Sequence, residues 1–240
     1  MKKVLFAFFA FVSLNLCAQP WKTVKGDGNL KKETREVTNF TSLASHGAID
    51  VQISYGTSNS ISVEADENLL QYIETTVDNG ELIIKPKQNI NLKSRSRMIV
   101  YVSMTTINSL SQSGSGNIKG DGEFSNDDKA DIKVSGSGNI KLDFGTFHNI
   151  GLFVSGSGNI EMKGNTADNI SATVAGSGNI DCSKVNCNEV NARISGSGNV
   201  RVSAEKTINA EISGSGNVFY KGDATDITSK ISGSGKVIKI

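Results

Sequence analysis

The sequence contains few of the residues from which catalytic and metal centres are usually built. Its 240 residues include two histidines, three cysteines, one tryptophan and two prolines. His46 and His148 belong to no metal-binding or triad motif, and there is no Gly-x-Ser-x-Gly, His-Glu-x-x-His or P-loop pattern. We therefore expect no enzyme activity, no cofactor and no metal site.

Neither sign of charge predominates. Lys and Arg together number 25 and Asp and Glu number 24, which gives a formal net charge of +1 at pH 7. A nearly neutral chain lacks the basic surface that attracts nucleic acid, so we expect no nucleic-acid partner. Beyond residue 18 no apolar run is long enough to cross a membrane as a helix, so we expect no transmembrane segment in the mature chain.

The first residues have the pattern of an export signal. Lys2 and Lys3 precede an apolar run from Val4 to Leu16, and Leu16-Cys17-Ala18 places a small residue before Gln19. This pattern predicts a signal peptide over residues 1–18 and an exported protein that is periplasmic, on the outer surface or secreted. Lipoprotein anchoring at Cys17 is the alternative, and it is disfavoured because Gly, Ala or Ser normally precedes a lipidated cysteine.

The most prominent feature of the sequence is a repeat in its second half. The motif Ser-Gly-Ser-Gly-Asn begins at Ser113, Ser135, Ser155, Ser195 and Ser213, a variant begins at Ala175, and a copy ending in Lys236 begins at Ser232. The seven copies are 18 to 22 residues apart, and apolar residues alternate with polar ones on both sides of each copy. This period and alternation are typical of a β-solenoid.

We therefore predict an all-β fold, a parallel β-helix-like solenoid of about seven rungs of ~20 residues each, with a β-rich N-terminal part. Glycine at each corner permits positive φ and close approach of the next rung. The asparagine of each motif is expected to stack on its neighbours as a turn ladder along the axis. Its members are Asn117, Asn139, Asn159, Asn179, Asn199 and Asn217.

Two functional interpretations of the glycine motif are less well supported. Calcium-binding glycine-rich repeats carry an aspartate in each short repeat, whereas this motif carries a neutral asparagine and has about twice the period. A phosphate-binding glycine loop is followed by a helix, whereas this motif is followed by a strand pattern. The motif is therefore interpreted as structural.

The chain divides into three predicted parts: the signal peptide 1–18, a β-rich N-terminal domain 19–105 and the repeat solenoid 106–240. In the N-terminal domain, strands are expected near 48–54, 60–65, 82–85 and 98–104. Asp78-Asn79-Gly80 predicts a hairpin turn, and residues 66–73 predict a short helix or turn that Asp66 caps. We expect this domain to pack on the solenoid or continue into it and to cover its first rung.

The outward positions of the repeat supply the candidate binding residues. Phe153 has outward parity, between Lys133 and Thr173 of the adjacent rungs, and predicts a small exposed aromatic site. Cys182 and Cys187 either form a disulfide within one rung or are small residues that fill space in the core. The terminal rung ends in Val237-Ile238-Lys239-Ile240 and presents an open edge, which would permit self-association.

These segments together resemble a known family. Gly26-Asp-Gly-Asn-Leu30, the segment from Phe40, the strand from Gly47, residues 63–70 and the Gly-Ser-Gly-Asn repeats are similar to the head GIN domain of putative autotransporter adhesins. The resemblance covers nearly all of residues 25–240. It implies an all-β, helix-like architecture and a bacterial cell-envelope or secreted location, and it supplies no catalytic or ligand residues.

The function that follows is an adhesin-like binding module without catalysis, whose partner is an unknown protein or glycan. One alternative is a structural or scaffolding protein of the envelope. Another is a β-helix that binds or cleaves carbohydrate, which would need acids that converge on one face. Asp143, Asp168 and Asp181 are instead scattered along the repeat.

The export pattern gives a prediction about the first residue of the mature protein. We expect it to be Gln19, because Ala18 is the small residue that signal peptidase prefers before its cleavage site. Intact-mass measurement of the protein from the envelope fraction checks this. A lipid-modified Cys17 as the first residue would contradict the prediction.

Overall fold

The computed structural model describes residues 21–240, so the predicted signal peptide and Cys17 lie outside the described residues. Of the described residues, 73% lie in strands and 2% in helix. None of the helical structure in residues 21–240 is long and apolar enough to cross a membrane. The high strand content confirms the predicted all-β class.

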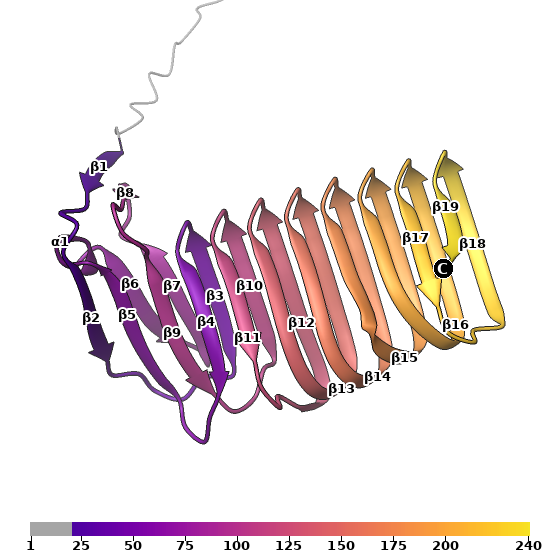
Figure 1. The fold of residues 1–240 in the computed structure, drawn as a ribbon, viewed down its shortest axis with the longest axis horizontal. Coiled ribbons are helices and arrows are strands. Elements are labelled where there is room, and N and C mark those ends of the chain that lie inside the picture. Colours follow the sequence, from indigo (N-terminus) through magenta and orange to yellow (C-terminus); the bar gives the residue numbers. More distant parts are fainter. Residues whose placement is uncertain (1–20) are drawn as a thin grey trace, which may run out of the picture.

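The repeat forms a parallel β-solenoid (Figure 1). Its seven glycine corners enclose about six complete turns, so the turn number is slightly below the seven predicted rungs. Successive turns pair in parallel and in register, as in Ile140 with Ile160 and Ile160 with Ile180. The strands are β10 (Ser109–Gly114), β11 (Asn117–Asp121), β12 (Asn126–Gly136), β13 (Asn139–Gly156), β14 (Asn159–Gly176), β15 (Asn179–Gly196), β16 (Asn199–Gly214), β17 (Asn217–Lys221), β18 (Asp226–Gly233) and β19 (Lys236–Lys239).

The core lies between the two walls of the solenoid. Alternate residues of each strand point inward, so like residues stack on like from turn to turn, as Val134, Val154 and Val174 do. These inward residues are almost fully buried, with Val174 at 0% exposure. At the bends opposite the glycine corners the walls are bridged by larger side chains, and the rings of Phe144 and Phe147 stack 4.6 Å apart. Burial of these columns supplies the main favourable free energy of folding.

Each corner needs two glycines for two different reasons. The first glycine of each motif has a φ between +112° and +130°, a region that L residues with a side chain avoid. The second glycine is not in that region; at Gly158 a Cβ would lie 2.1 Å from the Gly138 carbonyl oxygen and 2.5 Å from Val134. The carbonyl of Gly136 meanwhile accepts hydrogen bonds from the N–H groups of both Ser157 and Gly158, each at 2.9 Å.

The motif asparagines form one row along the glycine corners. Each side-chain amide donates to the side-chain oxygen of the preceding asparagine, from 2.8 Å between Asn159 and Asn139 to 3.3 Å between Asn217 and Asn199. Most of these oxygens also accept the next backbone N–H. The row begins at Asp50, whose carboxylate accepts from the Asn117 side chain at 3.0 Å, and ends where the Lys236 N–H donates to Asn217 at 3.1 Å.

The N-terminal part continues the same sheet. Strands β3 and β4 pair in parallel, in register, with β10 and β11, so the sheet crosses the predicted boundary at residue 105 without a break. Strands β7 and β9 pair with the other edges of β3 and β4, and antiparallel β2, β5 and β6 complete this end. The strands are β1 (Lys22–Lys25), β2 (Leu30–Arg35), β3 (Ser42–Gly47), β4 (Asp50–Tyr55), β5 (Ser60–Asp66), β6 (Ile73–Asp78), β7 (Glu81–Pro86), β8 (Ile90–Lys93) and β9 (Ile99–Met104).

Local expectations for the N-terminal part agree with the structure in outline. The hairpin between β6 and β7 turns at Asn79 and Gly80, which have φ of 48° and 78°. The helix α1 (Glu67–Leu70) is present and Asp66 is at its N-cap position, but the Asp66 side chain makes no capping hydrogen bond. The Asp66 carboxylate is buried and accepts hydrogen bonds from the Ser94 hydroxyl and the Arg95 N–H, which fixes the loop after β8 against the sheet.

The two ends of the rod differ. The N-terminal end is covered by the antiparallel strands, whereas among residues 21–240 β18 and β19 pair only with β16 and β17. Ile227 and Ile231 occupy inward positions of the last rung yet are 39% and 41% exposed. The C-terminal rung is thus an open parallel edge.

The corner geometry predicts the effect of a single substitution. Gly158→Val should lower the free energy of unfolding by about 3 kcal/mol or more, because the new side chain overlaps the Gly138 carbonyl and Val134. Lys163→Ala, which removes only an exposed contact with Asp143, should cost less than about 1 kcal/mol. Denaturant unfolding of both variants is the measurement, and equal midpoints would mean that the corners are not tightly stacked.

Candidate functional site

The predicted binding residues lie on the outer face of one wall of the solenoid. Lys133 pairs with Phe153 and Phe153 with Thr173, so these three side chains are neighbours on adjacent rungs. They are part of one outward column, here called the outer row. Its members are Ser111, Lys133, Phe153, Thr173, Arg193, Glu211 and Lys230.

Phe153 is half-buried rather than fully exposed. Its ring covers Gly151, where a Cβ would come within 2.9 Å of the ring, and the Lys133 ammonium lies 5.7 Å from the ring centre. That ammonium is also 3.5 Å from the Asp131 carboxylate. An exposed cation–aromatic contact contributes about 0.5–1 kcal/mol. The pair therefore presents an aromatic surface beside an ammonium group that the Asp131 carboxylate holds in place.

A shallow depression of about 190 Å³ adjoins the outer row from Thr173 onward. Its floor includes Ala192 and Ala210, and its sides include the Asn191 and Asn209 amides, which hydrogen-bond to each other at 3.1 Å. The Arg193 guanidinium and the Glu211 carboxylate form an ion pair at 2.9 Å along its rim. This amide pair is not among the binding residues predicted from the sequence, although its two asparagines lie one repeat period apart.

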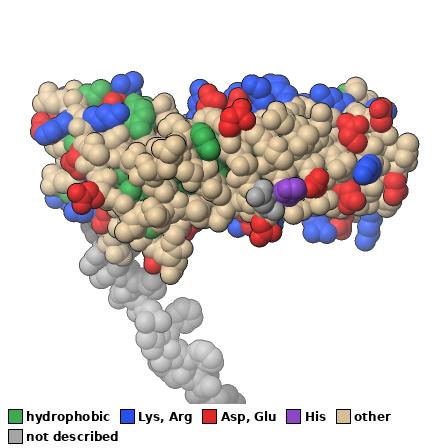
Figure 2. Space-filling view, turned by 90° about the horizontal axis from the view of Figure 1, so that it is seen from below, with side chains coloured by type: hydrophobic (Ala, Val, Ile, Leu, Met, Phe, Trp, Pro, Cys, Tyr) green, Lys and Arg blue, Asp and Glu red, His purple; other side chains and the backbone are tan. Residues whose placement is uncertain are grey.

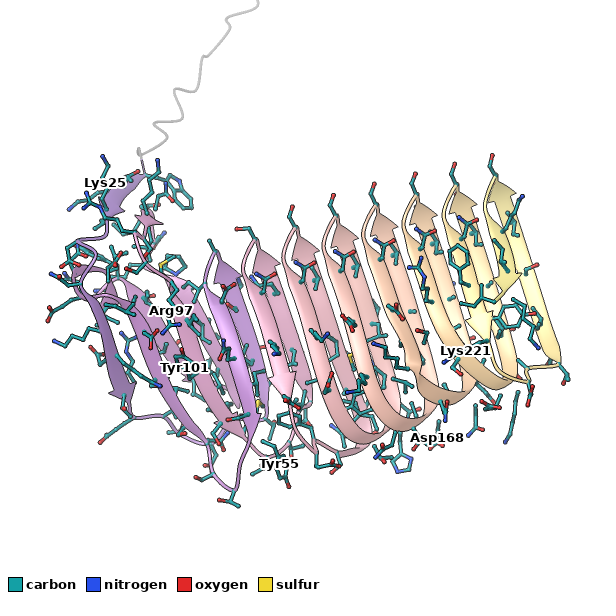
Figure 3. The ribbon with its side chains drawn as sticks, in the orientation of Figure 1. Lys25, Tyr55, Arg97, Tyr101, Asp168 and Lys221 are labelled. Carbon is teal, nitrogen blue, oxygen red and sulfur yellow. The ribbon has the colours of Figure 1, made fainter. Side chains whose placement is uncertain are left out.

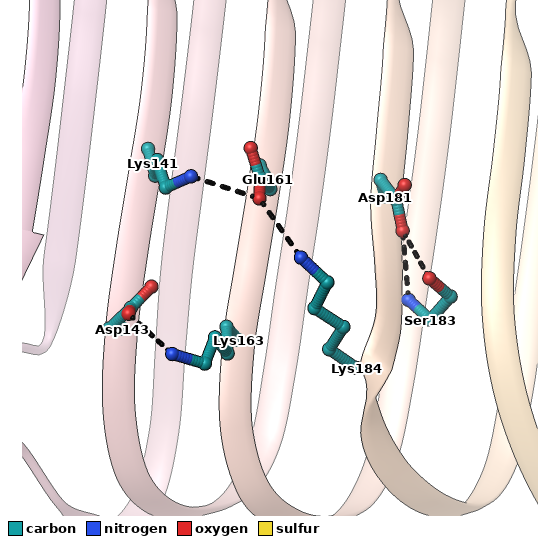
Figure 4. Close-up of polar contacts among 7 residues, drawn as sticks. All are labelled: Lys141, Asp143, Glu161, Lys163, Asp181, Ser183 and Lys184. Carbon is teal, nitrogen blue, oxygen red and sulfur yellow. Dashed lines mark hydrogen bonds and ion pairs between the residues drawn. The ribbon is translucent and has the colours of Figure 1, made fainter.

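The outer face of the other wall carries ion pairs between rungs (Figure 4). The Glu161 carboxylate lies 3.0 Å from the Lys141 ammonium and 3.7 Å from that of Lys184, and Asp143 lies 3.1 Å from Lys163. Viewed from the side of the bends, Lys and Arg side chains are interspersed with Asp and Glu (Figure 2). Such exposed ion pairs add little stability. On the other wall each of these carboxylates lies beside a lysine, so the two signs of charge alternate there.

The acids considered for carbohydrate cleavage are engaged separately. Asp143 faces Lys163, Asp181 accepts hydrogen bonds from the Ser183 N–H and hydroxyl, and Asp168 lies at the bend side 2.5 Å from His148 (Figure 3). They do not converge on one point of the surface. Among residues 21–240 no group of three or more His, Cys, Asp or Glu side chains could hold a metal ion.

Cys182 and Cys187 are free thiols in the structure, and both are buried. The Cys182 thiol donates to the Arg201 carbonyl at 3.4 Å and the Cys187 thiol to the Glu189 carbonyl at 3.0 Å. Burial raises the pKa of Cys187 to about 11 and raises that of Cys182 well above its usual value. The two residues fill the core of one rung, and their pairing as a disulfide stays a prediction.

Comparison with known proteins gives one family and several structures. The model of a family described as "Putative auto-transporter adhesin, head GIN domain" matches residues 39–224. A comparison with curated proteins gives no match. A putative adhesin from Bacteroides fragilis has a TM-score of 0.81 at 19% identity, covering 90% of this chain and 100% of that chain, which shows a shared fold.

Two structures from Parabacteroides distasonis are also similar. One is described as a putative lipid binding protein, with a TM-score of 0.76 and 26% identity; the alignment covers 91% of this chain and 100% of that chain. The other is described as a putative adhesin, with a TM-score of 0.68 and 24% identity; this alignment also covers 91% of this chain and 100% of that chain. The solenoid and its N-terminal cover are therefore common to these proteins.

The buried thiols give a prediction about reactivity. Because the thiolate is the reactive form and burial disfavours it, both cysteines should react slowly with Ellman's reagent at pH 8 in the folded protein and rapidly after denaturation. Alkylation of Cys187 in the folded chain should keep rising with pH up to about 11. Two thiols in the denatured, unreduced protein would exclude the disulfide, and none would show that it forms.

Proposed function

This chain belongs to the family described as putative auto-transporter adhesins with a head GIN domain, and on that premise we propose that it is an adhesin-like binding module of the bacterial cell surface that acts without catalysis. Its ligand is a protein or glycan bound from outside the cell. The export pattern of residues 1–18 supports a location in the periplasm, on the outer surface or in the medium.

The observation that carries the proposal is the outer row with its adjoining depression. Phe153 and the Lys133 ammonium offer an aromatic surface and a cation, and the depression next to Thr173 offers paired amides and an ion pair. Stacked rungs hold all of these groups on a rigid wall, so an extended ligand would bind several of them with little loss of conformational entropy in the protein. Aromatic and arginine side chains are also enriched in binding interfaces.

A structural role is the second candidate, and the open C-terminal rung supports it. Its inward isoleucines Ile227 and Ile231 have no rung above them, and Ile240 is 63% exposed. An uncovered parallel edge is a template for pairing with another chain. In this alternative the protein associates with its own copies through β18 and β19.

Removal of the outer-row aromatic tests the adhesive role. Phe153→Ala should weaken retention of a host matrix protein or glycan on the immobilised protein by about tenfold. The substitution removes the aromatic ring and with it the contact that helps to position the Lys133 ammonium. Phe219→Ala is the matched control, because Phe219 is also an outward, half-buried phenylalanine with a cation, Arg201, 5.1 Å from its ring centre, on the other wall.

The outcomes separate the two candidate functions. If the Phe153→Ala variant no longer binds a ligand that the Phe219→Ala variant still binds, the result supports the outer row as the binding face. Equal binding of that ligand by both variants contradicts it. Retention of only free copies of the protein itself, abolished by Ile231→Lys in the last rung, would favour the structural role instead.

A further inference from the structure

A groove at the N-terminal end of the molecule is separate from the outer row. The short ribbon of β1 and β8 stands apart from the main sheet, beside the ends of β7 and β3 (Figure 1). The Lys22 N–H donates to the Asn89 carbonyl at 2.9 Å, which fixes the ribbon at its start. The space between ribbon and sheet measures about 670 Å³, and its lining residues include Trp21, Ile83, Lys85, Pro86, Lys87 and Ile90.

The walls of this groove are largely apolar. Ile83 and Pro86 contribute from β7, Ile90 contributes from the ribbon, and Trp21 lies at one side with 69% of its surface exposed. Transfer of apolar area out of water is favourable, so a ligand chain that covers the indole and the two isoleucines is stabilised in this groove. The dimensions are within the range of small-molecule sites, about 300–1,000 Å³.

The polar side chains of the groove are basic or neutral. Lys85, Lys87 and His46 stand at its edge, and no aspartate or glutamate is among the described residues that line it. The Lys85 ammonium forms a long ion pair with the Glu74 carboxylate, at 3.9 Å. The Lys87 ammonium lies 6.0 Å from the Tyr72 ring centre. Both ammonium groups are exposed, so an incoming anion can bind them without the cost of breaking a buried pair.

We propose that this groove binds a single-chain anionic amphiphile, specifically a fatty acid. The carboxylate lies at Lys85 and Lys87, and the alkyl chain lies along Ile83, Ile90 and Trp21. The lysines favour a negatively charged head group, and the apolar walls favour an alkyl chain. A short carboxylate lacks the chain and a cationic detergent lacks the negative charge, so neither meets both requirements.

Trp21 is the only tryptophan of the sequence, which makes it a reporter within the groove. Laurate titrated into the purified protein below its micellar concentration should shift the tryptophan emission to shorter wavelength, in a saturable manner, because the alkyl chain displaces water from the exposed indole. Acetate and dodecyltrimethylammonium at the same concentrations should give less than about a tenth of the effect. An equal shift with the cationic detergent would overturn the assignment of a carboxylate site.

A charge-reversal pair tests the head-group residues by calorimetry. Lys85→Glu with Lys87→Glu should weaken laurate binding at least about tenfold, which corresponds to about 1.4 kcal/mol. The matched control is Lys206→Glu with Lys221→Glu, two exposed lysines at the other end of the rod, which should leave the affinity unchanged. Equal affinity in both double variants, or a response to phosphatidylglycerol vesicles without saturable binding of free laurate, would overturn the proposal.

Discussion

Each turn of the solenoid forms its backbone hydrogen bonds with the turns on either side, and this in-register parallel stacking constrains nearly every other feature of the chain. A residue at one position of a rung lies directly over the equivalent residue of the next, so a column must tolerate its own repetition. Apolar columns become the core, and glycine columns allow the corner carbonyls to approach within hydrogen-bonding distance of two N–H groups. Residues that stack well on themselves, such as isoleucine, valine and glycine, therefore recur at these positions.

Stacking also explains why the ends of the rod matter. A rung in the middle has partners on both sides, whereas a terminal rung has unpaired backbone groups and half-covered side chains. At the N-terminal end, antiparallel strands cover the first coil, and Asp50 starts the asparagine row because a carboxylate accepts from Asn117 without needing to donate. The C-terminal rung has no such cover, which is why Ile227 and Ile231 remain exposed.

The two proposed binding sites use different parts of this architecture. The outer row is a product of repetition, because adjacent rungs present one side chain each at fixed spacing on a rigid wall. The N-terminal groove is a product of irregularity, because it forms where the β1–β8 ribbon leaves the sheet. A flat repeated surface suits an extended ligand, and a largely apolar groove suits a small one, so both could operate in one molecule.

The sequence by itself determined the solenoid, its parallel register and the columns of its core, since a fixed period and strict alternation leave one consistent way to stack the rungs. It also placed Lys133, Phe153 and Thr173 on one column, because positions one period apart must be neighbours. It did not reveal which of the two reasons holds at Gly158: a Cβ there would lie 2.1 Å from the Gly138 carbonyl oxygen, whereas the φ of this glycine is not in the positive region. Nor did it reveal Asp50 in the asparagine row, the buried Asp66 or the groove beside Trp21. These contacts join residues that share no period, so only the folding of the non-repeating segments in space decides which of them meet.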